Sequence, residues 1–364
     1  MKKFYYVLAM LFLFTGNFGE VKAQDIHFSQ FYMSPLNLNP AMTGVMHCNH
    51  RFVVNYRNQW SSVMKNNSFS TYSLSYDHRI PVGRDDYFGV GASLWGDRAG
   101  ESNFSTTQGR LSGSFSKYMG GDRNQSSYLV AGADFGVAQR GIDLSRLQWG
   151  TQHDGAGGWD ENAPSGEEFD RDNFFFGDVS LGLMWFTTWN DGRSLYLGAA
   201  AHHVNRPNQS FFGDTDIELY TKYTLHGGGE VPMGHNFALV PNAVAMFQGP
   251  SFQLNSGVSA RFDLGSRMDR QSFQIGAWVR IVNNYNWGIN TTVEPAVVEE
   301  DVKLGADAFI LTSRFDFEYF GLGFSYDINV SDLRRATNGN GAFEFSFIYY
   351  ICGQEVRGVY CPRW

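Results

Sequence analysis

Residues 127–139 read SYLVAGADFGVAQ, and this stretch decides the fold of the chain. Its apolar residues recur at every second position from Leu129 to Val137, and Asp134 lies among the small residues between them. Because successive side chains of a strand point to opposite faces, the pattern predicts a strand with one apolar face and one polar face. A strand with lipid on one side and water on the other has this pattern.

Residues 272–282, SFQIGAWVRIV, show the same alternation, with Gln274 and Arg280 on the polar side. Weaker runs follow the same rule and bring the expected number of strands to about fourteen, an even number as in bacterial outer-membrane barrels. These runs are residues 52–60, 68–79, 86–95, 104–117, 175–187, 194–204, 218–230, 236–247, 251–263, 302–311, 315–327 and 342–350.

The connections sort by length along the chain. Those after even-numbered strands are short and rich in turn residues, whereas every long connection follows an odd-numbered strand: residues 140–174, 205–217, 282–301 and 328–341. Outer-membrane barrels have short periplasmic turns and longer external loops. We therefore expect both termini in the periplasm.

The start of the chain is expected to be a signal peptide. Lys2 and Lys3 precede an apolar run at residues 4–14, which is shorter than the roughly 20 residues that a spanning helix needs. Small-residue spacing favours cleavage between Ala23 and Gln24. No later stretch is long and apolar enough for a helical span, and a closed barrel is the remaining way for a chain to cross a membrane.

We therefore expect an all-β chain: a single transmembrane antiparallel up-and-down β-barrel at residues 52–350. A signal peptide at residues 1–23 and a plug-like segment at residues 24–51, folded into the lumen or mouth, precede it, and a periplasmic tail at residues 351–364 follows. The plug is expected because the segment carries aromatic and apolar residues that a disordered tail would lack. A soluble β-sandwich alternates equally well and is the alternative fold.

Few patterns indicate chemistry. His202 and His203 are adjacent and point to opposite faces of a strand end, so they do not easily chelate one metal ion, and a structural or loop role is favoured. Gly-x-Ser-x-Gly does not occur, which leaves a hydrolase as a weak alternative. We expect no enzyme activity and no cofactor, and the net charge of −8 argues against nucleic acid as a partner.

Two further features leave alternatives open. The acidic, glycine-rich loop at residues 140–174 could bind calcium or a basic partner, but its spacing fits no EF-hand, and a solvated loop explains the same composition. Three cysteines enter an oxidising compartment, where Cys352 and Cys361 could pair and leave Cys48 free.

Two blocks of residues resemble a known family. The first block holds Gln24-Asp25, the run from Phe28 to Phe31, Pro35-Leu36, the run from Leu38 to Ala41, Gly44, and the run from Asn55 to Trp60. The second holds Gly321-Leu322-Gly323, Tyr326-Asp327, Asn329 to Ser331, Leu333, the run from Gly341 to Glu344, and Cys361-Pro362. In these blocks the chain resembles the PorP/SprF family of type IX secretion system membrane proteins from Bacteroidetes.

The resemblance implies an outer-membrane barrel, in contact with outer-membrane lipid, that serves protein secretion or gliding motility. Its expected partners are secreted surface proteins with a C-terminal sorting domain, such as gliding adhesins, which it would help to reach or remain anchored on the cell surface, and the periplasmic ring of the secretion machinery. A passive or substrate-specific pore is the main rival function, because Asp134, Gln274 and Arg280 would face a lumen. The expected plug argues against an open pore.

Candidate site residues come from the motif blocks and the strand positions. The end of the first strand should lie near the outer rim, where aromatic and guanidinium groups often anchor partners. Asn55 and Arg57 share one strand face, and from the lumen they would hydrogen-bond the N-terminal segment. The candidates for partner binding or for holding the plug are Phe31, Asn39, Pro40, Tyr56, Arg57, Gln59, Trp60, Asp327 and Asn329.

Overall fold

The computed structural model describes residues 25–353, except residues 123, 156–157, 159, 161, 168, 213–216, 266–270, 291–296 and 333, and it describes no side chains for residues 284–302. The expected signal peptide and Cys361 lie outside the described residues. No helix in the described part of the chain is both long and apolar enough to cross a membrane.

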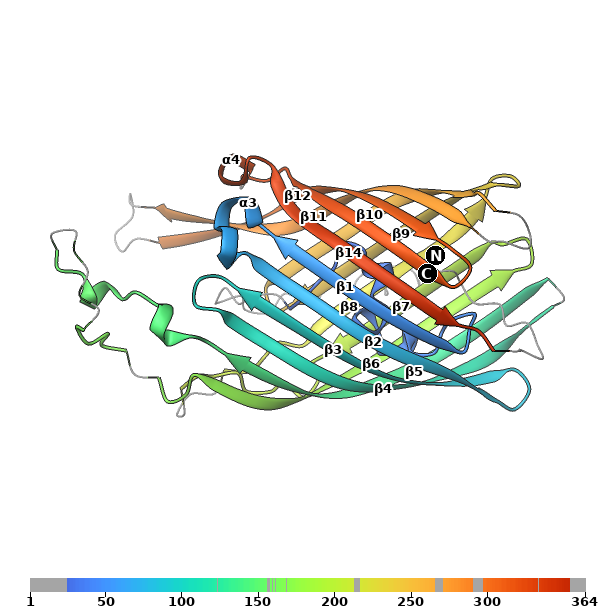
Figure 1. Ribbon diagram of the computed structural model, residues 1–364, viewed down its shortest axis with the longest axis horizontal. Helices are drawn as coiled ribbons and strands as arrows, with labels where there is room; N and C mark the ends of the chain where they lie inside the picture. Colours follow the sequence, from blue (N-terminus) through green and yellow to red (C-terminus); the bar gives the residue numbers. More distant parts are fainter. Residues whose placement is uncertain are drawn as a thin grey trace.

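Fourteen antiparallel strands form one closed barrel, in which each strand pairs with its neighbours in the sequence and β1 pairs with β14 (Figure 1). The predicted architecture and the even strand number are thereby confirmed. The strands are β1 (His50–Gln59), β2 (Phe69–Val82), β3 (Asp86–Ala99), β4 (Phe104–Asp122), β5 (Gln125–Gly141), β6 (Asn173–Trp189), β7 (Ser194–His202), β8 (Lys222–Pro232), β9 (Phe237–Gln248), β10 (Ser251–Asp263), β11 (Ser272–Asn290), β12 (Val297–Asp316), β13 (Phe320–Asn329) and β14 (Asn340–Ile351).

The alternation that predicted the strands does separate an outer face from an inner face. In β5, Leu129, Phe135 and Val137 are exposed on the outside, while Asp134 is buried on the inside. Gln274 also faces inward, as expected. The apolar side chains exposed on the outer wall form the surface that lipid covers in an outer-membrane barrel.

The strand boundaries differ most from the sequence expectation in β11 and β12. Residues 312–314, expected as a turn, belong to β12, and the chain turns at residues 317–319 instead. Most of the expected loop at residues 282–301 continues β11 and β12 as a paired ribbon, from Asn283 opposite Leu304 to Asn290 opposite Val297. Strand pairing can outlast the alternation of apolar residues, because the backbone hydrogen bonds need no lipid-facing side chain.

The two ends of the barrel differ in their connections. The β5–β6 connection, the β11–β12 ribbon and two short helices, α3 (Ser61–Met64) and α4 (Arg334–Thr337), gather at one end, which we call the long-loop end (Figure 1). The six even-numbered connections lie at the other, the short-turn end. Loop length therefore distinguishes the two ends, as the sequence indicated.

Residues 25–49 lie inside the barrel, and we call this segment the plug (Figure 1). It consists of tight turns: η1 (Phe31–Met33), α2 (Pro35–Leu38) and η2 (Pro40–Met42). Proline occupies the first position of α2 and of η2, where its missing N–H leaves no helical hydrogen bond unmade. The remaining short helices, η3 (Lys65–Asn67), η4 (Leu144–Arg146) and η5 (Gly150–Gln152), lie in the loops.

Candidate functional site

The plug runs through the lumen from the long-loop end to the short-turn end. Its first described residue, Asp25, lies 3.6 Å from Lys222, the first residue of β8, and its backbone N–H donates to Gln248, the last residue of β9. At the other end, the N–H of Asn49 donates to the carbonyl of Ile351, the last residue of β14. The chain therefore crosses the lumen before β1 begins.

Ser29 is held by four buried ionic side chains that come from four different strands. Arg57 donates to its hydroxyl over 2.8 Å, Arg280 also donates to that hydroxyl, and the hydroxyl approaches both carboxylate oxygens of Asp327 at 2.8 and 2.9 Å. Glu344 accepts the backbone N–H of Ser29 over 2.6 Å. We call Arg57, Arg280, Asp327 and Glu344 the Ser29 cage.

The Ser29 cage is electrically balanced. Arg57 pairs with both Asp327, over 3.1 Å, and Glu344, and Arg280 pairs with Asp327 over 2.8 Å. All four side chains are at most 3% exposed. Two guanidinium groups and two carboxylates therefore compensate one another, which is the condition under which buried charges are tolerated.

The middle of the plug is fixed by one asparagine and by aromatic packing. The amide of Asn39 donates to the backbone carbonyls of Leu183 over 3.1 Å and of Ala199 over 3.2 Å, and it lies 3.0 Å from a ring nitrogen of His226. The side-chain carbonyl of Asn39 caps η2 by accepting the backbone N–H of Ala41. Elsewhere, Phe31 and Tyr32 pack against Trp278 with ring centroids 5.8 and 5.6 Å apart.

A buried ion pair holds the plug where it approaches the short-turn end. Arg51 and Asp77 form a two-point pair with distances of 3.0 and 2.7 Å, and both side chains are fully buried. Arg51 also donates to the carbonyl of Met42 over 3.0 Å, and Asp77 accepts the N–H of Gly44 over 2.7 Å. The pair thus holds the backbone of the plug at two points, with Arg51 as a donor and Asp77 as an acceptor.

Glycines of the inner wall and of the plug let the two backbones approach each other closely. A Cβ atom on Gly132 of β5 would lie 2.5 Å from the backbone nitrogen of Ala41, and one on Gly44 would lie 2.5 Å from the Cα of Gly89 in β3. Gly44 also has a φ of +71°, which disfavours any other residue. The plug backbone therefore lies directly against the wall at these points.

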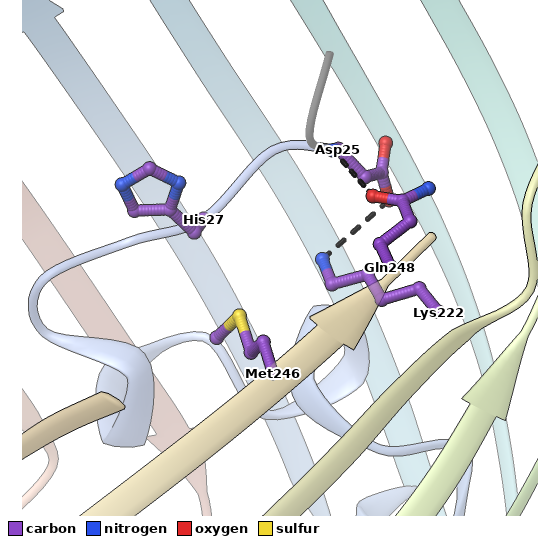
Figure 2. Close-up of a pocket in the computed structure, with 5 residues that line it drawn as sticks. All are labelled: Asp25, His27, Lys222, Met246 and Gln248. Atoms are coloured by element: carbon purple, nitrogen blue, oxygen red, sulfur yellow. Dashed lines mark hydrogen bonds and ion pairs between the residues drawn. The ribbon is translucent and has the colours of Figure 1, made fainter. Parts of the chain in front are cut away.

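The first residues of the plug line a cavity of about 10 Å³ together with Lys222, Met246 and Gln248 (Figure 2). Such a volume holds about one water molecule. Burial raises the pKa of Asp25, but Lys222 and His203 more than reverse the effect and hold this pKa well below its usual range. Asp25 therefore enters the lumen as a carboxylate with two cationic or hydrogen-bonding partners.

His203, which follows β7, connects the plug to the wall. Its ring nitrogens lie 2.9 Å from Asp178 and 3.3 Å from Asp25. Burial lowers the pKa of His203, but hydrogen bonds with these two carboxylates raise it to about 9. His202 approaches the carbonyl of Leu38 at 3.4 Å. Both histidines thus have structural contacts.

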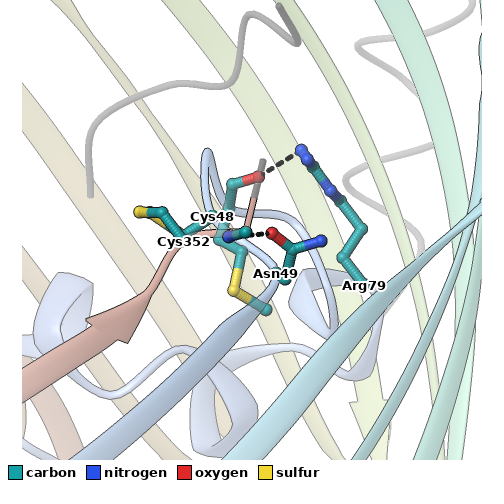
Figure 3. The surroundings of a disulfide bond; sticks show 6 residues. Cys48, Asn49, Arg79 and Cys352 are labelled. Atoms are coloured by element: carbon teal, nitrogen blue, oxygen red, sulfur yellow. Dashed lines mark hydrogen bonds between the residues drawn. A yellow bond between two sulfur atoms is a disulfide. The ribbon is translucent and has the colours of Figure 1, made fainter. Parts of the chain in front are cut away.

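The predicted disulfide is wrong. Cys352 bonds to Cys48, at the end of the plug, and not to Cys361 (Figure 3). Closure of the barrel between β1 and β14 brings the segments before and after these strands together, although 304 residues separate the two cysteines. In the described part of the chain, His47 and these cysteines form the group that could hold a metal ion, but the disulfide engages both sulfur atoms.

The remaining sequence candidates divide between the lumen and the outside. Asn55 donates to the carbonyl of Met33 over 3.0 Å, so it touches the plug as Arg57 does, whereas Tyr56 lies on the outer wall and is 41% exposed. Trp60 directly follows β1 in a left-handed conformation, and its backbone N–H donates to the carbonyl of Gly341.

Three other candidates have local roles. Gln59 accepts a long hydrogen bond, 3.4 Å, from Arg57. The side-chain amide of Asn329, the last residue of β13, donates to Thr337 in α4 and to the carbonyl of Asn340, the first residue of β14. Pro40 begins η2.

Several plug contacts were missed by the sequence analysis. Arg51, Asp77 and Glu344 bind the plug, and Trp278 packs against it, yet none was singled out as a candidate. A usable signal existed, because each of them occupies an inward position of an alternating strand, where a charge or a large ring needs a partner.

A model of one protein family matches most of the chain. The family described as type IX secretion system membrane protein PorP/SprF matches residues 20–349. No curated protein sequence matches the chain.

Among solved structures, the CymD monoaromatic hydrocarbon channel is similar, with 11% identity, a TM-score of 0.45 and coverage of 89% of this chain and 94% of that chain. The toluene transporter TbuX of Ralstonia pickettii is similar at 12% identity and a TM-score of 0.44, with coverage of 87% and 94%.

Proposed function

This chain belongs to the PorP/SprF family of type IX secretion system membrane proteins, and from that premise we propose that it is a sealed barrel that binds exported proteins at its long-loop end. Membership makes it an outer-membrane component of that secretion system. The proposed cargo is the class of surface proteins with a C-terminal sorting domain, gliding adhesins among them, which the barrel would help to reach the surface and stay there. We propose no catalytic activity.

The filled lumen is the observation that carries this proposal. Contacts from β1, β6, β8, β11 and β14 converge on the plug from all around the barrel. Buried ion pairs fix it toward both ends, and the disulfide ties its last residues to the end of β14. A permanently open pore needs an unobstructed lumen. A sealed barrel leaves its ends as the surfaces on which to bind other proteins.

An aromatic platform at the long-loop end supports the choice of binding surface. The β5–β6 and β7–β8 connections pack together through Phe169 and Phe212, whose ring centroids lie 5.2 Å apart. Trp149 packs on the same cluster, with its ring centroid 5.9 Å from that of Phe169. Arg171 donates to the carbonyl of Ser210 over 2.9 Å and joins the same connections. Phe212 is 38% exposed, and Trp149 and Phe169 are half-buried beside it. Aromatic rings are frequent anchors for protein partners.

The orientation of the barrel assigns the other partners. We place the short-turn end and both termini in the periplasm, by loop length. There the barrel would meet the periplasmic ring of the secretion machinery. The acidic β5–β6 connection would then face the outside as a solvated loop.

The test compares two pairs of aromatic substitutions in cells. Phe169→Ala with Phe212→Ala removes the rings that join the two connections, and Phe317→Ala with Tyr319→Ala removes rings at the short-turn end, where Phe317 is 38% and Tyr319 46% exposed. We expect the first pair to lower the amount of sorting-domain proteins on the surface and the control pair to leave it unchanged, at equal barrel abundance. Normal surface amounts with the first pair would contradict the proposed binding surface.

Conductance measured in a planar bilayer distinguishes a sealed anchor from a pore. Purified protein with its disulfide intact is expected to give no stable single-channel current. A large, steady current from the unaltered protein would overturn the sealed barrel.

A further inference from the structure

Most lysine and arginine side chains in the described part of the chain have a partner. Most pair with a carboxylate, as Lys117 does with Asp86, and others bind a carbonyl or lie over a ring, as Arg79 does over Tyr87. Four have no such partner, and all four are exposed: Lys65, Arg98, Arg334 and Arg335.

These four cations lie on one continuous arc of the barrel rim. Arg334 and Arg335 are in α4, between β13 and β14, and Lys65 directly follows α3, between β1 and β2. The two helices lie side by side at the long-loop end (Figure 1). Arg98 is on the outer face of β3, opposite Ser70 near the start of β2. Because β13, β14, β1, β2 and β3 are consecutive in the barrel, the cations share one side of it.

The arc lies next to an apolar outer wall. The side chains of Tyr56, Tyr72 and Phe343 face outward from β1, β2 and β14, and they are 41%, 48% and 45% exposed. Val63 in α3 is 47% exposed beside Lys65. Cations at the edge of a lipid-facing apolar surface are placed at the depth of lipid headgroups.

The charge of the arc contrasts with that of the chain. Two exposed carboxylates lie near these cations along the chain: Asp332 in the β13–β14 connection and Glu101 in the β3–β4 connection. Four cations and two anions leave a local charge of +2, whereas the chain carries −8. An anion is therefore attracted here and repelled by the chain as a whole.

We propose that this arc, Lys65, Arg98, Arg334 and Arg335 with the apolar wall beside it, binds a lipid that carries a phosphorylated headgroup. The cations would contact the phosphate groups, and Tyr56, Tyr72 and Phe343 would contact the acyl chains. A free phosphate ion or an acidic peptide would use the cations alone, and it would leave the adjoining apolar surface without a role.

The inference uses the membrane orientation proposed above but needs no exported protein. A purified barrel can therefore bind the lipid even if the proposed cargo surface is wrong. Conversely, a failure to bind lipid would leave the cargo test unaffected.

Native mass spectrometry of the full-length protein in detergent tests the site. The probe is bisphosphorylated lipid A, compared with its dephosphorylated form and with inorganic phosphate. The site variant is Lys65→Gln, Arg334→Gln and Arg335→Gln. The control removes three exposed, carboxylate-paired cations at the short-turn end by Arg84→Gln, Lys117→Gln and Arg193→Gln, with the same change in net charge.

A cation near a lipid surface contributes about a fivefold change in binding, so the site variant should bind about a hundredfold more weakly. The control should bind as the unaltered protein does, and dephosphorylated lipid should bind weakly to all three. Equal binding by the site variant and the control would overturn the proposal. So would displacement of the lipid by millimolar inorganic phosphate, which would indicate a site for the free ion. The variants should fold, because the substituted side chains are all exposed, and the heat-dependent mobility shift of the barrel checks this. Arg98→Gln alone provides a milder variant.

Discussion

Removing the Glu344 side chain should release the first part of the plug. Its carboxylate accepts the N–H groups of Ser29 over 2.6 Å and of Gln30 over 3.0 Å, and it pairs with Arg57. Glu344→Ala leaves both amides without their acceptor. It also changes the summed charge of the four side chains of the Ser29 cage from zero to +1. Arg57 then keeps Asp327 as its carboxylate partner, while Arg280 keeps both Asp327 and Asp307.

The magnitude follows from the two backbone contacts. A hydrogen bond to a charged group contributes about 1.5 to 3 kcal/mol, so the loss of two weakens the docking of residues 29–30 by at least about 3 kcal/mol. An energy of about 1.4 kcal/mol corresponds to a factor of ten, so the open state of this segment should become more than about a hundredfold more populated.

Hydrogen–deuterium exchange measures that population directly. Amides that exchange through local opening lose protection in proportion to the population of the open state. In Glu344→Ala, the amides of Ser29 and Gln30 should exchange about a hundredfold faster. Amides near Gly44, which are held by the separate ion pair of Arg51 and Asp77, should change much less.

A matched control removes a buried glutamate that does not touch the plug. Glu230 pairs with Arg261 within the wall, and both are buried. Glu230→Ala should destabilise the barrel while leaving exchange at residues 29–30 unchanged. The reasoning is refuted if exchange at these amides is unaltered in a folded Glu344→Ala protein, or if the control accelerates it equally.

Three further outcomes are expected. Non-reducing proteolysis and mass spectrometry should recover a linked peptide pair containing Cys48 and Cys352, and a bond from Cys352 to the other tail cysteine would contradict the structure. Gly132→Val should push the plug off the wall and open a current in planar bilayers. Gly109→Val should give no current, because a Cβ atom on Gly109 would meet nothing within 4 Å. The contribution of His203 to plug docking should be complete below pH 6.5 and disappear as the pH rises through about 9, because the pKa of His203 is raised on folding. Hydrogen–deuterium exchange of the first plug residues, corrected for intrinsic rates, should therefore be faster at pH 10 than at pH 7. Equal corrected rates at the two pH values would contradict this role of His203.

The candidate site could be predicted only in outline. The plug was expected from its aromatic residues, and the inward faces of Asn55 and Arg57 from strand alternation. The residues that meet Arg57 were not all found, because Arg280 and Glu344 come from β11 and β14, far away in the sequence. Alternation shows that a side chain faces the lumen, but it does not show the height or the side of the barrel at which it lies.

The sequence by itself determined the barrel, because a period of two, with apolar outside and polar inside, is a local property of each strand. Loop lengths likewise distinguished the two ends. Only the tertiary structure decided that Cys48 bonds Cys352 and that four strands meet at Ser29. The physical reason is that contacts across the lumen depend on how the sheet closes, with its tilt and stagger summed over all fourteen strands. No single segment carries that information.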